Sequence, residues 1–313
     1  MTSSGTLSIA RRVVKLMGNR FEFTVVTVER DQAEAAIDAA IAEVQRIEAL
    51  LTTFNEQSQT AAINRAAGEH PVQVDAEVYA LIERSLRISA LTQGAFDISY
   101  GSLDKRFWNF DSSMTALPDK DTANQMVGLI DYRNIILDKG SRSVFLRKKG
   151  MRIGFGGIGK GYAAERAKEI LLRLGMEDGV VNAGGDLAAW GHQPDGRPWT
   201  IGIAAPDATH HPFSSLNITN KAVATSGNYE KYVLIGGRRY SHTIDPRTGY
   251  PVSGIKSATI ICPHAELADA LATPVTVMGV KAGLHLVNQL PDVACLLIDD
   301  NDLLFTSNNI KLT

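Results

Sequence analysis

The hydrophobic positions of this chain follow two spacings that alternate along its length. Residues 33–51 carry apolar side chains three and four positions apart, which predicts an amphipathic helix. Residues 21–29 (FEFTVVTVE) alternate apolar and polar positions, which predicts a strand. Further segments with helical spacing are 78–92, 162–174, 265–273 and 283–289. Further segments typical of strands are 135–137, 144–146, 179–182, 199–205, 216–224, 232–235, 239–242, 258–262, 294–299 and 303–306.

This order of elements predicts an α+β protein. Strands outnumber clean strand–helix–strand alternations, so a doubly wound parallel sheet, and with it a Rossmann fold, is disfavoured. We expect residues 1–313 to form a single large mixed domain with two lobes around a cleft, and residues 1–10 to be flexible.

The most unusual stretch is 154–161 (GFGGIGKG), which contains five glycines between a predicted strand and a predicted helix. Glycines admit a ligand close to the backbone, and a helix N-terminus adds free N–H groups, so the stretch could cradle a phosphate. It also matches a dinucleotide fingerprint and most of a P-loop, although Gly161 stands where a P-loop has Ser or Thr. A tight structural turn is an equally good interpretation of these residues alone.

The composition of the chain argues against several classes of protein. Hydrophobic residues make up 44% and charged residues 21% of the chain, and the net charge is −2, which gives no general attraction to nucleic acid or anionic membranes. No uninterrupted apolar run approaches the ~20 residues that span a bilayer. The two cysteines, Cys262 and Cys295, lie in apolar strand-like runs and are expected to be buried free thiols. Together with the lack of a signal peptide in this sequence, these features favour a cytoplasmic protein over a periplasmic one.

Four segments contain residue types suited to chemistry. Asp269 and Thr273 lie four positions apart on one helix face, and both offer the oxygen ligands that magnesium prefers. His242 ends a predicted strand just before an Asp-Pro-x-x-Gly turn, where it could accept a proton at neutral pH. The segments 182–186 (NAGGD) and 225–227 (TSG) are polar turns at strand ends. Each also has an ordinary structural interpretation: an exposed helix face, a histidine bound to turn carbonyls, or a plain turn.

Taken together and in order, these segments resemble the ApbE family, the FAD:protein FMN transferases. The resemblance covers nearly the whole chain, from Met17-Gly18 to about Gly283. The matching motifs are Gly-Ala-Phe-Asp at 94–97, Gly-Gly-Ile-x-Lys-Gly-Tyr-Ala at 156–163, Asn-Ala-Gly-Gly-Asp at 182–186, Thr-Ser-Gly-x-Tyr-Glu at 225–230, Ser-His-x-Ile-Asp-Pro-Arg-Thr-Gly-x-Pro at 241–251 and Asp-Ala-Leu-Ala-Thr at 269–273.

The resemblance implies a flavin nucleotide cleft in which FMN is transferred from FAD to a threonine or serine hydroxyl of a target flavoprotein, with AMP released and Mg²⁺ required. The implied metal ligands are Asp269, Thr273 and the carbonyl of Gly157, and the implied base is His242. The positions that match FAD contacts are Met17, Phe54, Ala95, Phe96, Asp97, Lys160 and His242. Phe54 stands where many members have tyrosine, so stacking is kept while a phenol hydrogen bond is lost.

Three departures from the family pattern leave alternatives open. Gly154-Phe155 replaces an Asp-Leu pair that many members carry, so a carboxylate expected near FAD is missing. Pro274 follows Thr273, where it is expected to bend or stop the helix. The typical lipoprotein cysteine is also missing, which argues against a membrane-anchored periplasmic form. The alternatives are an FAD pyrophosphatase that releases FMN and AMP, and a non-catalytic FAD-binding protein.

Overall fold

The structure is a computed structural model that describes residues 6–104, 114–205, 208–227 and 232–310.

The largest sheet is antiparallel throughout. The sheet has the strand order β1 (Ser8–Leu16), β2 (Asn19–Thr27), β6 (Gly179–Ala183), β7 (Asp186–Trp190), β10 (Lys221–Gly227), β13 (Ile255–Cys262), β14 (Ala294–Asp299) and β15 (Leu304–Thr306). Each neighbouring pair of strands is antiparallel, and this pairing excludes a doubly wound parallel sheet.

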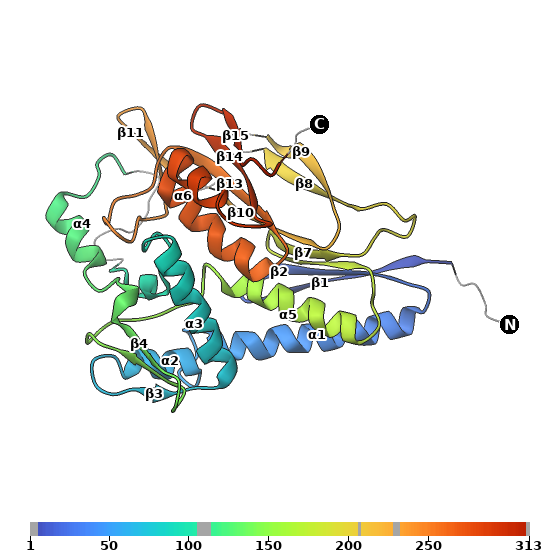
Figure 1. Ribbon diagram of the computed structural model, residues 1–313, viewed down its shortest axis with the longest axis horizontal. Coiled ribbons are helices and arrows are strands. Elements are labelled where there is room, and N and C mark those ends of the chain that lie inside the picture. The colour runs from blue at the N-terminus through green and yellow to red at the C-terminus, as the bar shows by residue number, and fades with distance from the viewer. Residues whose placement is uncertain (1–5, 105–113, 206–207, 228–231, 311–313) are drawn as a thin grey trace.

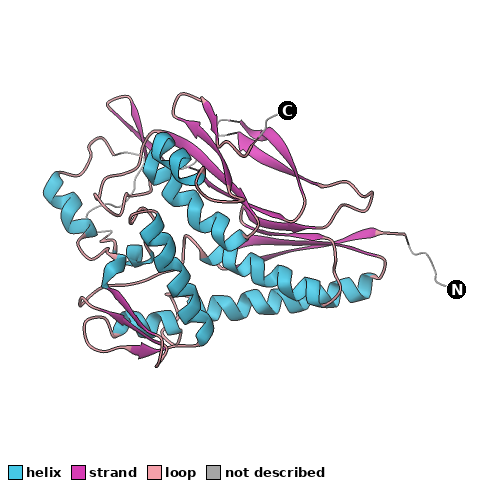
Figure 2. Ribbon diagram, in the orientation of Figure 1, coloured by secondary structure: helices cyan, strands magenta, loops and turns pink. Residues whose placement is uncertain are grey.

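Three long helices cover one face of this sheet (Figures 1 and 2). They are α1 (Arg30–Leu51), α5 (Gly159–Arg173) and α6 (Ala265–Val287), and they pack on one another and on the strands. The apolar stripe of α1 that the spacing predicted is buried from Ala33 to Leu51. Between the helices and the sheet lies the main hydrophobic core, which includes Phe21, Phe23 and Trp190.

The opposite face of the sheet is covered by a hairpin of β8 (Trp199–Ala205) and β9 (Ala208–Ile218). A smaller apolar cluster fills this interface, with Trp199 against Leu187 and Val223 of the sheet. A second hairpin, β11 (Tyr232–Ile235) and β12 (Arg238–Ser241), turns through Gly236 and Gly237, both with positive φ.

A small sheet with its own helices forms the lower left of Figure 1. Its strand order is β3 (Val72–Gln73), β5 (Ser143–Leu146), β4 (Ile135–Asp138). The helices of this region are α2 (Gln59–Arg65), α3 (Ala76–Leu91), α4 (Lys120–Val127) and the 3₁₀ turns η1 (Ile98–Ser102) and η2 (Tyr132–Asn134). The glycine-rich loop, residues 147–158, leaves β5 and enters α5, so it links the small sheet to the main helical layer.

Some strand predictions were wrong. Residues 1–10 were expected to be flexible, but Ser8 to Ala10 belong to β1, where Ala10 is buried. Residues 216–224 were expected to form one strand, but β9 ends at Ile218 and β10 begins at Lys221, because Asn220 adopts φ 51° and reverses the chain. Strand β7 was missed because every one of its five residues is buried, which erases the alternation.

The break in α6 was predicted at the wrong residue. Pro274 does not stop the helix, and the kink lies at Gly279 (φ 81°, ψ 172°), so the predicted helices 265–273 and 283–289 correspond to the two helical parts on either side of that kink. Proline removes one backbone N–H, and here its ring is buried with the apolar residues around it, so packing offsets the lost hydrogen bond.

The continuation of α6 past the proline creates a long apolar helix. Among the described helices, α6 alone is long and apolar enough to cross a membrane by length and composition, although half of its most apolar stretch is buried inside the protein. It packs on α5, β10 and β13, and this packing accounts for its apolar character.

Gly279→Ala should lower the free energy of unfolding by about 1–3 kcal/mol, because φ 81° with ψ 172° is a region that only glycine occupies readily. No atom blocks a Cβ at this position, so backbone strain is the only expected cause. Urea denaturation measures the change. Gly128→Ala is the control, since Gly128 has helical φ −59° and should be neutral or slightly stabilised; equal losses in the two variants would contradict the prediction.

Candidate functional site

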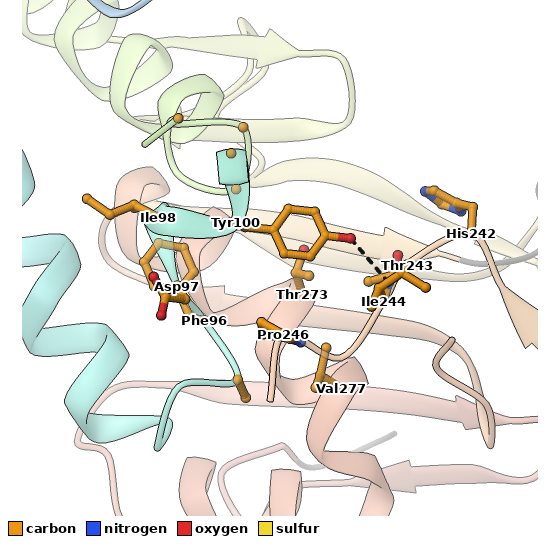
Figure 3. Close-up of a pocket in the computed structure, with 15 residues that line it drawn as sticks. Phe96, Asp97, Ile98, Tyr100, His242, Thr243, Ile244, Pro246, Thr273 and Val277 are labelled. Carbon is orange, nitrogen blue, oxygen red and sulfur yellow. Dashed lines mark hydrogen bonds between the residues drawn. The ribbon is translucent and has the colours of Figure 1, made fainter. Parts of the chain in front are cut away.

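A cavity of about 400 Å³ lies where four segments meet, and Figure 3 shows the residues that line it. The segments are the chain after α3, the glycine-rich loop, the chain after β12, and the middle of α6. Figure 3 shows His242 and Thr243 on the opposite side of Tyr100 from Phe96 and Asp97. The lining residues are Ala95, Phe96, Asp97, Ile98, Tyr100, Gly101, Gly154, Gly156, Gly157, His242, Thr243, Ile244, Pro246, Thr273 and Val277.

The first wall is shaped by the end of α3. Gln93 (φ 51°) and Gly94 (φ 79°) end the helix, and the Gly94 N–H donates to the carbonyl of Ser89. Asp97 then accepts hydrogen bonds from the N–H of Ser99 at 2.8 Å and of Tyr132 at 2.7 Å. Burial raises the pKa of Asp97 despite these donors. Asp97 therefore holds η1 and η2 together, and its carboxylate is already occupied by protein donors.

The opposite wall carries His242. This side chain is exposed and follows β12 directly. The Tyr100 hydroxyl accepts a hydrogen bond from the Ile244 N–H at 3.2 Å, which joins the His242 segment to η1. The predicted Asp-Pro-x-x-Gly turn follows, and its Gly249 (φ 75°) lies so close to α4 that a Cβ would be 2.1 Å from the Ala123 carbonyl. His242 thus stands at the rim of the cavity on a loop that is held at both ends.

A second cavity of about 440 Å³ shares the glycine-rich loop with the first. Gly154 and Gly156 line both cavities. Met17 forms the turn between β1 and β2 with φ 49°, and its methyl group reaches towards the first residue of α5. Phe54 is 98% exposed. The residues that line this cavity are Met17, Gly18, Asn19, Glu48, Leu51, Thr52, Thr53, Phe54, Gly154, Phe155, Gly156 and Lys160.

Next to the loop lies a cluster of three charged side chains, of which the two carboxylates are buried and Lys160 is half-buried. Lys160, in the first turn of α5, makes an ion pair with Asp186 at the start of β7. Asp269, in α6, accepts a hydrogen bond from the Gly161 N–H at 2.9 Å. Asp186 is 3% and Asp269 is 6% exposed. Two buried carboxylates therefore share one ammonium group.

The charges of this cluster shift one another. Burial, and then the neighbouring charge of Asp186, raise the pKa of Asp269 to about 7. Burial also raises the pKa of Asp186, although the Lys160 charge opposes that shift. For Lys160 burial lowers the pKa, but the two carboxylates outweigh it and the net direction is upward. The cluster lacks one positive charge when both carboxylates are ionised.

The residues fit a magnesium ion. Asp269, Thr273 one turn further along α6, and the Gly157 carbonyl are hard oxygen donors, and Gly157 and Thr273 line the first cavity. A divalent cation would also supply the positive charge that is needed to balance Asp186 and Asp269 when both are ionised. Within the described residues no group of three or more His, Cys, Asp or Glu side chains is arranged for a metal, so the ion would share its coordination with water and substrate oxygens, as Mg²⁺ commonly does.

The structure brings most of the sequence-predicted residues to the two cavities. Ala95, Phe96, Asp97, Gly157, His242 and Thr273 line the first cavity, and Met17, Phe54 and Lys160 line the second. Asp269 lines neither and lies buried beside Gly161.

Other residues of the motifs have structural partners or were overlooked. Thr225 hydrogen bonds Thr259 across β10 and β13, while residues 228–230 of the same motif lie outside the described residues. The pairing of Asp186 with Lys160 was missed, although the acid after two glycines in 182–186 was a visible signal. Tyr100, which belongs to no motif, was also missed. Gly154 has open space around it, because a Cβ added there would lie 3.8 Å from its nearest neighbour, the Thr53 methyl group.

Comparison with known proteins identifies the relatives of this chain. The family model described as the ApbE family matches residues 17–297. An FAD:protein FMN transferase from Klebsiella pneumoniae (strain 342) is 33% identical over 277 residues, covering 88% of this chain and 85% of the relative. An FAD:protein FMN transferase from Treponema pallidum (strain Nichols) is 32% identical over 282 residues, covering 85% of this chain and 78% of the relative.

A solved structure shares the fold. The crystal structure of the ApbE protein from Thermotoga maritima matches with a TM-score of 0.85 and 31% identity, covering 96% of this chain and 97% of that chain. The predicted α+β class is confirmed, and the Rossmann alternative is excluded by both this match and the antiparallel sheet.

The raised pKa of Asp269 predicts how stability depends on pH in protein stripped of metal with EDTA. The folded state keeps this proton up to about pH 7, whereas the unfolded chain releases it near pH ~4. Folded protein therefore binds more protons between these values, and its contribution to stability falls as pH rises from about 4 to about 7, by on the order of a few kcal/mol.

Asp269→Asn should flatten this dependence, because the amide cannot ionise beside Asp186 and Lys160. Urea unfolding at pH 5, 6, 7 and 8 measures it for both proteins. An equally steep loss of stability in wild type and variant would refute the assignment.

Proposed function

The chain belongs to the ApbE family, and from this membership and the two cavities we propose that it is a magnesium-dependent FAD:protein FMN transferase. It takes FMN from FAD, attaches it to a threonine or serine hydroxyl of a target flavoprotein, and releases AMP. The name FAD:protein FMN transferase is carried by relatives that are 33% and 32% identical over most of the chain.

The observation that carries the proposal is the shared wall of the two cavities. FAD has a ring system at each end and a pyrophosphate in the middle. Gly154 and Gly156 line both cavities, and the loop ends at the N-terminus of α5. Gly154 and Gly156 carry no side chain, so they let a pyrophosphate approach the backbone closely, while the two cavities beside the loop suit the two ring systems.

The residues around the loop have different roles in phosphoryl transfer. Phe54, which is exposed, offers a face for stacking a ring of the substrate, without the hydroxyl that tyrosine would add. Asp269, Thr273 and the Gly157 carbonyl would hold Mg²⁺, which when bound neutralises charge on the pyrophosphate oxygens. Lys160 lines the second cavity, and its ammonium group pairs with Asp186.

The transfer itself exchanges one phosphorus–oxygen bond for another. The hydroxyl of the acceptor attacks the FMN phosphorus, the bond to the bridging oxygen breaks, and AMP leaves with that oxygen. His242, at the rim of the cavity, accepts the hydroxyl proton as the new bond forms. Its exposure matters for this role, because the acceptor is a protein and must approach from outside.

Mass spectrometry of the purified protein incubated with FAD and MgCl₂ tests the function. Candidate flavoproteins from the same genome that carry an exposed Thr or Ser site serve as acceptors. We expect an acceptor that gains the mass of FMN, together with AMP in equal amount, and no reaction in EDTA. FMN and AMP released at a rate that no acceptor diverts would establish a pyrophosphatase instead, and tight FAD binding with no metal-dependent turnover would establish a binding protein.

His242→Ala should reduce transfer by about 10²–10⁴-fold, the usual contribution of a general base, while FAD binding stays near wild type. Fluorescence titration of FAD and the rate of acceptor labelling measure the two effects. His285→Ala is the matched control, since His285 is exposed near the end of α6 and lines neither cavity. Unchanged labelling by the His242 variant would remove it as the base.

A further inference from the structure

Neither α5 nor α6 caps its own N-terminus. The residue before α5 is Ile158 and the residue before α6 is His264, and neither side chain accepts a hydrogen bond from its helix. The first N–H groups of a helix have no partner within it, so buried helix starts require acceptors from elsewhere.

Each of the two helices supplies the acceptor for the other. The Gly161 N–H of α5 donates to Oδ2 of Asp269 on α6 at 2.9 Å. The Ala265 N–H of α6 donates to Oε2 of Glu165 on α5 at 2.7 Å. On each helix the donor and the carboxylate are four residues apart and therefore on one face. We call these two hydrogen bonds the reciprocal clamp.

The clamp works only because the helices touch at a glycine. A Cβ on Gly161 would lie 2.1 Å from the Ala265 carbonyl oxygen and 2.7 Å from Cβ of Asp269. The first turns of the helices are therefore in backbone contact, and a shift of α6 along α5 would move Asp269 directly.

Glu165 is well placed to prevent that shift. Its side chain is 15% exposed, and its second oxygen lies 3.4 Å from Nζ of Lys168. On the next position of α6, Glu266 pairs with Arg84 of α3 through two hydrogen bonds of 2.6 and 2.9 Å. The first turn of α6 is thus held from two sides, and of these two contacts the one from Glu165 acts on the helix backbone.

We propose that Glu165 is a positioning residue for the magnesium site: by capping α6 it sets the position of Asp269 relative to the glycine-rich loop. The inference rests on the proposed function for the metal's role. Glu165 lines neither cavity, so it acts through α6 and not by contact with substrate. The length of the Glu165 side chain matters more for capping α6 than its charge does, because an acceptor oxygen must reach the Ala265 N–H.

Calorimetric titration of MgCl₂ into protein saturated with FAD tests the proposal, with Glu165→Ala, Glu165→Asp and Glu165→Gln compared with wild type. The alanine and aspartate variants remove or shorten the reach, and we expect their apparent Kd for Mg²⁺ to rise by about tenfold or more. Glutamine keeps an acceptor oxygen at the same reach, and its Kd should stay within about threefold of wild type.

Ser307→Ala is the control for a purely structural loss, because Ser307 Oγ accepts the buried Cys295 N–H at 2.9 Å and Ser307 lines neither cavity. It should lower the melting temperature without changing the Kd for Mg²⁺. Unchanged affinity in the alanine and aspartate variants, or a change no larger than that of Ser307→Ala, overturns the proposal. A glutamine variant as weak as alanine beside a normal aspartate variant also overturns it. If the alanine variant fails to fold, the aspartate–glutamine comparison decides.

The same titration separates this inference from the proposed function. Altered Mg²⁺ affinity in protein that labels no acceptor would leave Glu165 as a positioning residue and refute only the transferase. Normal labelling of the acceptor with unaltered Mg²⁺ affinity in every Glu165 variant would support the transferase and refute only the positioning role of Glu165.

Discussion

The contact between the first turns of α5 and α6 governs the geometry of the site. Gly161 admits the Ala265 backbone to a distance that no other residue would allow, and Asp269 is buried as a result. The glycine-rich loop enters α5 at the same point, so its position is set by this contact too. A shift in the helix crossing would displace the loop, the buried carboxylates and one wall of the first cavity together.

The same contact buries two carboxylates beside one lysine, and this burial changes how readily they ionise. In water Asp186 and Asp269 would be ionised at neutral pH, whereas here burial raises both pKa values, and the charge of Asp186 raises the pKa of Asp269 further. An apolar pair of similar volume would be easier to bury, so stability alone does not account for this cluster. The Mg²⁺ ion that we propose would relieve the repulsion, and its binding would then be coupled to the stability of the helix contact.

The sequence predicted local structure well and long-range structure less well. Amphipathic spacing located α1, α3 and α5, and the order of motifs pointed to the ApbE family, which is confirmed. Strand β7 was missed because it is buried on both faces, and the break in α6 was predicted at Pro274 although it lies at Gly279, where φ 81° favours glycine. The roles of Asp186 and Glu165 could not be read from spacing, since each depends on a partner 26 or 100 residues away.

That separation has a consequence for synthesis of the protein. The two hydrogen bonds between α5 and α6 join positions 108 and 100 residues apart. A ribosome adds residues one by one, so α5 emerges long before its partner helix exists. Until α6 follows, Glu165 has no backbone to cap and Asp269 cannot accept the Gly161 N–H. The growing chain therefore displays the glycine-rich loop before the helix contact exists, and the first cavity is completed only after α6 has been made.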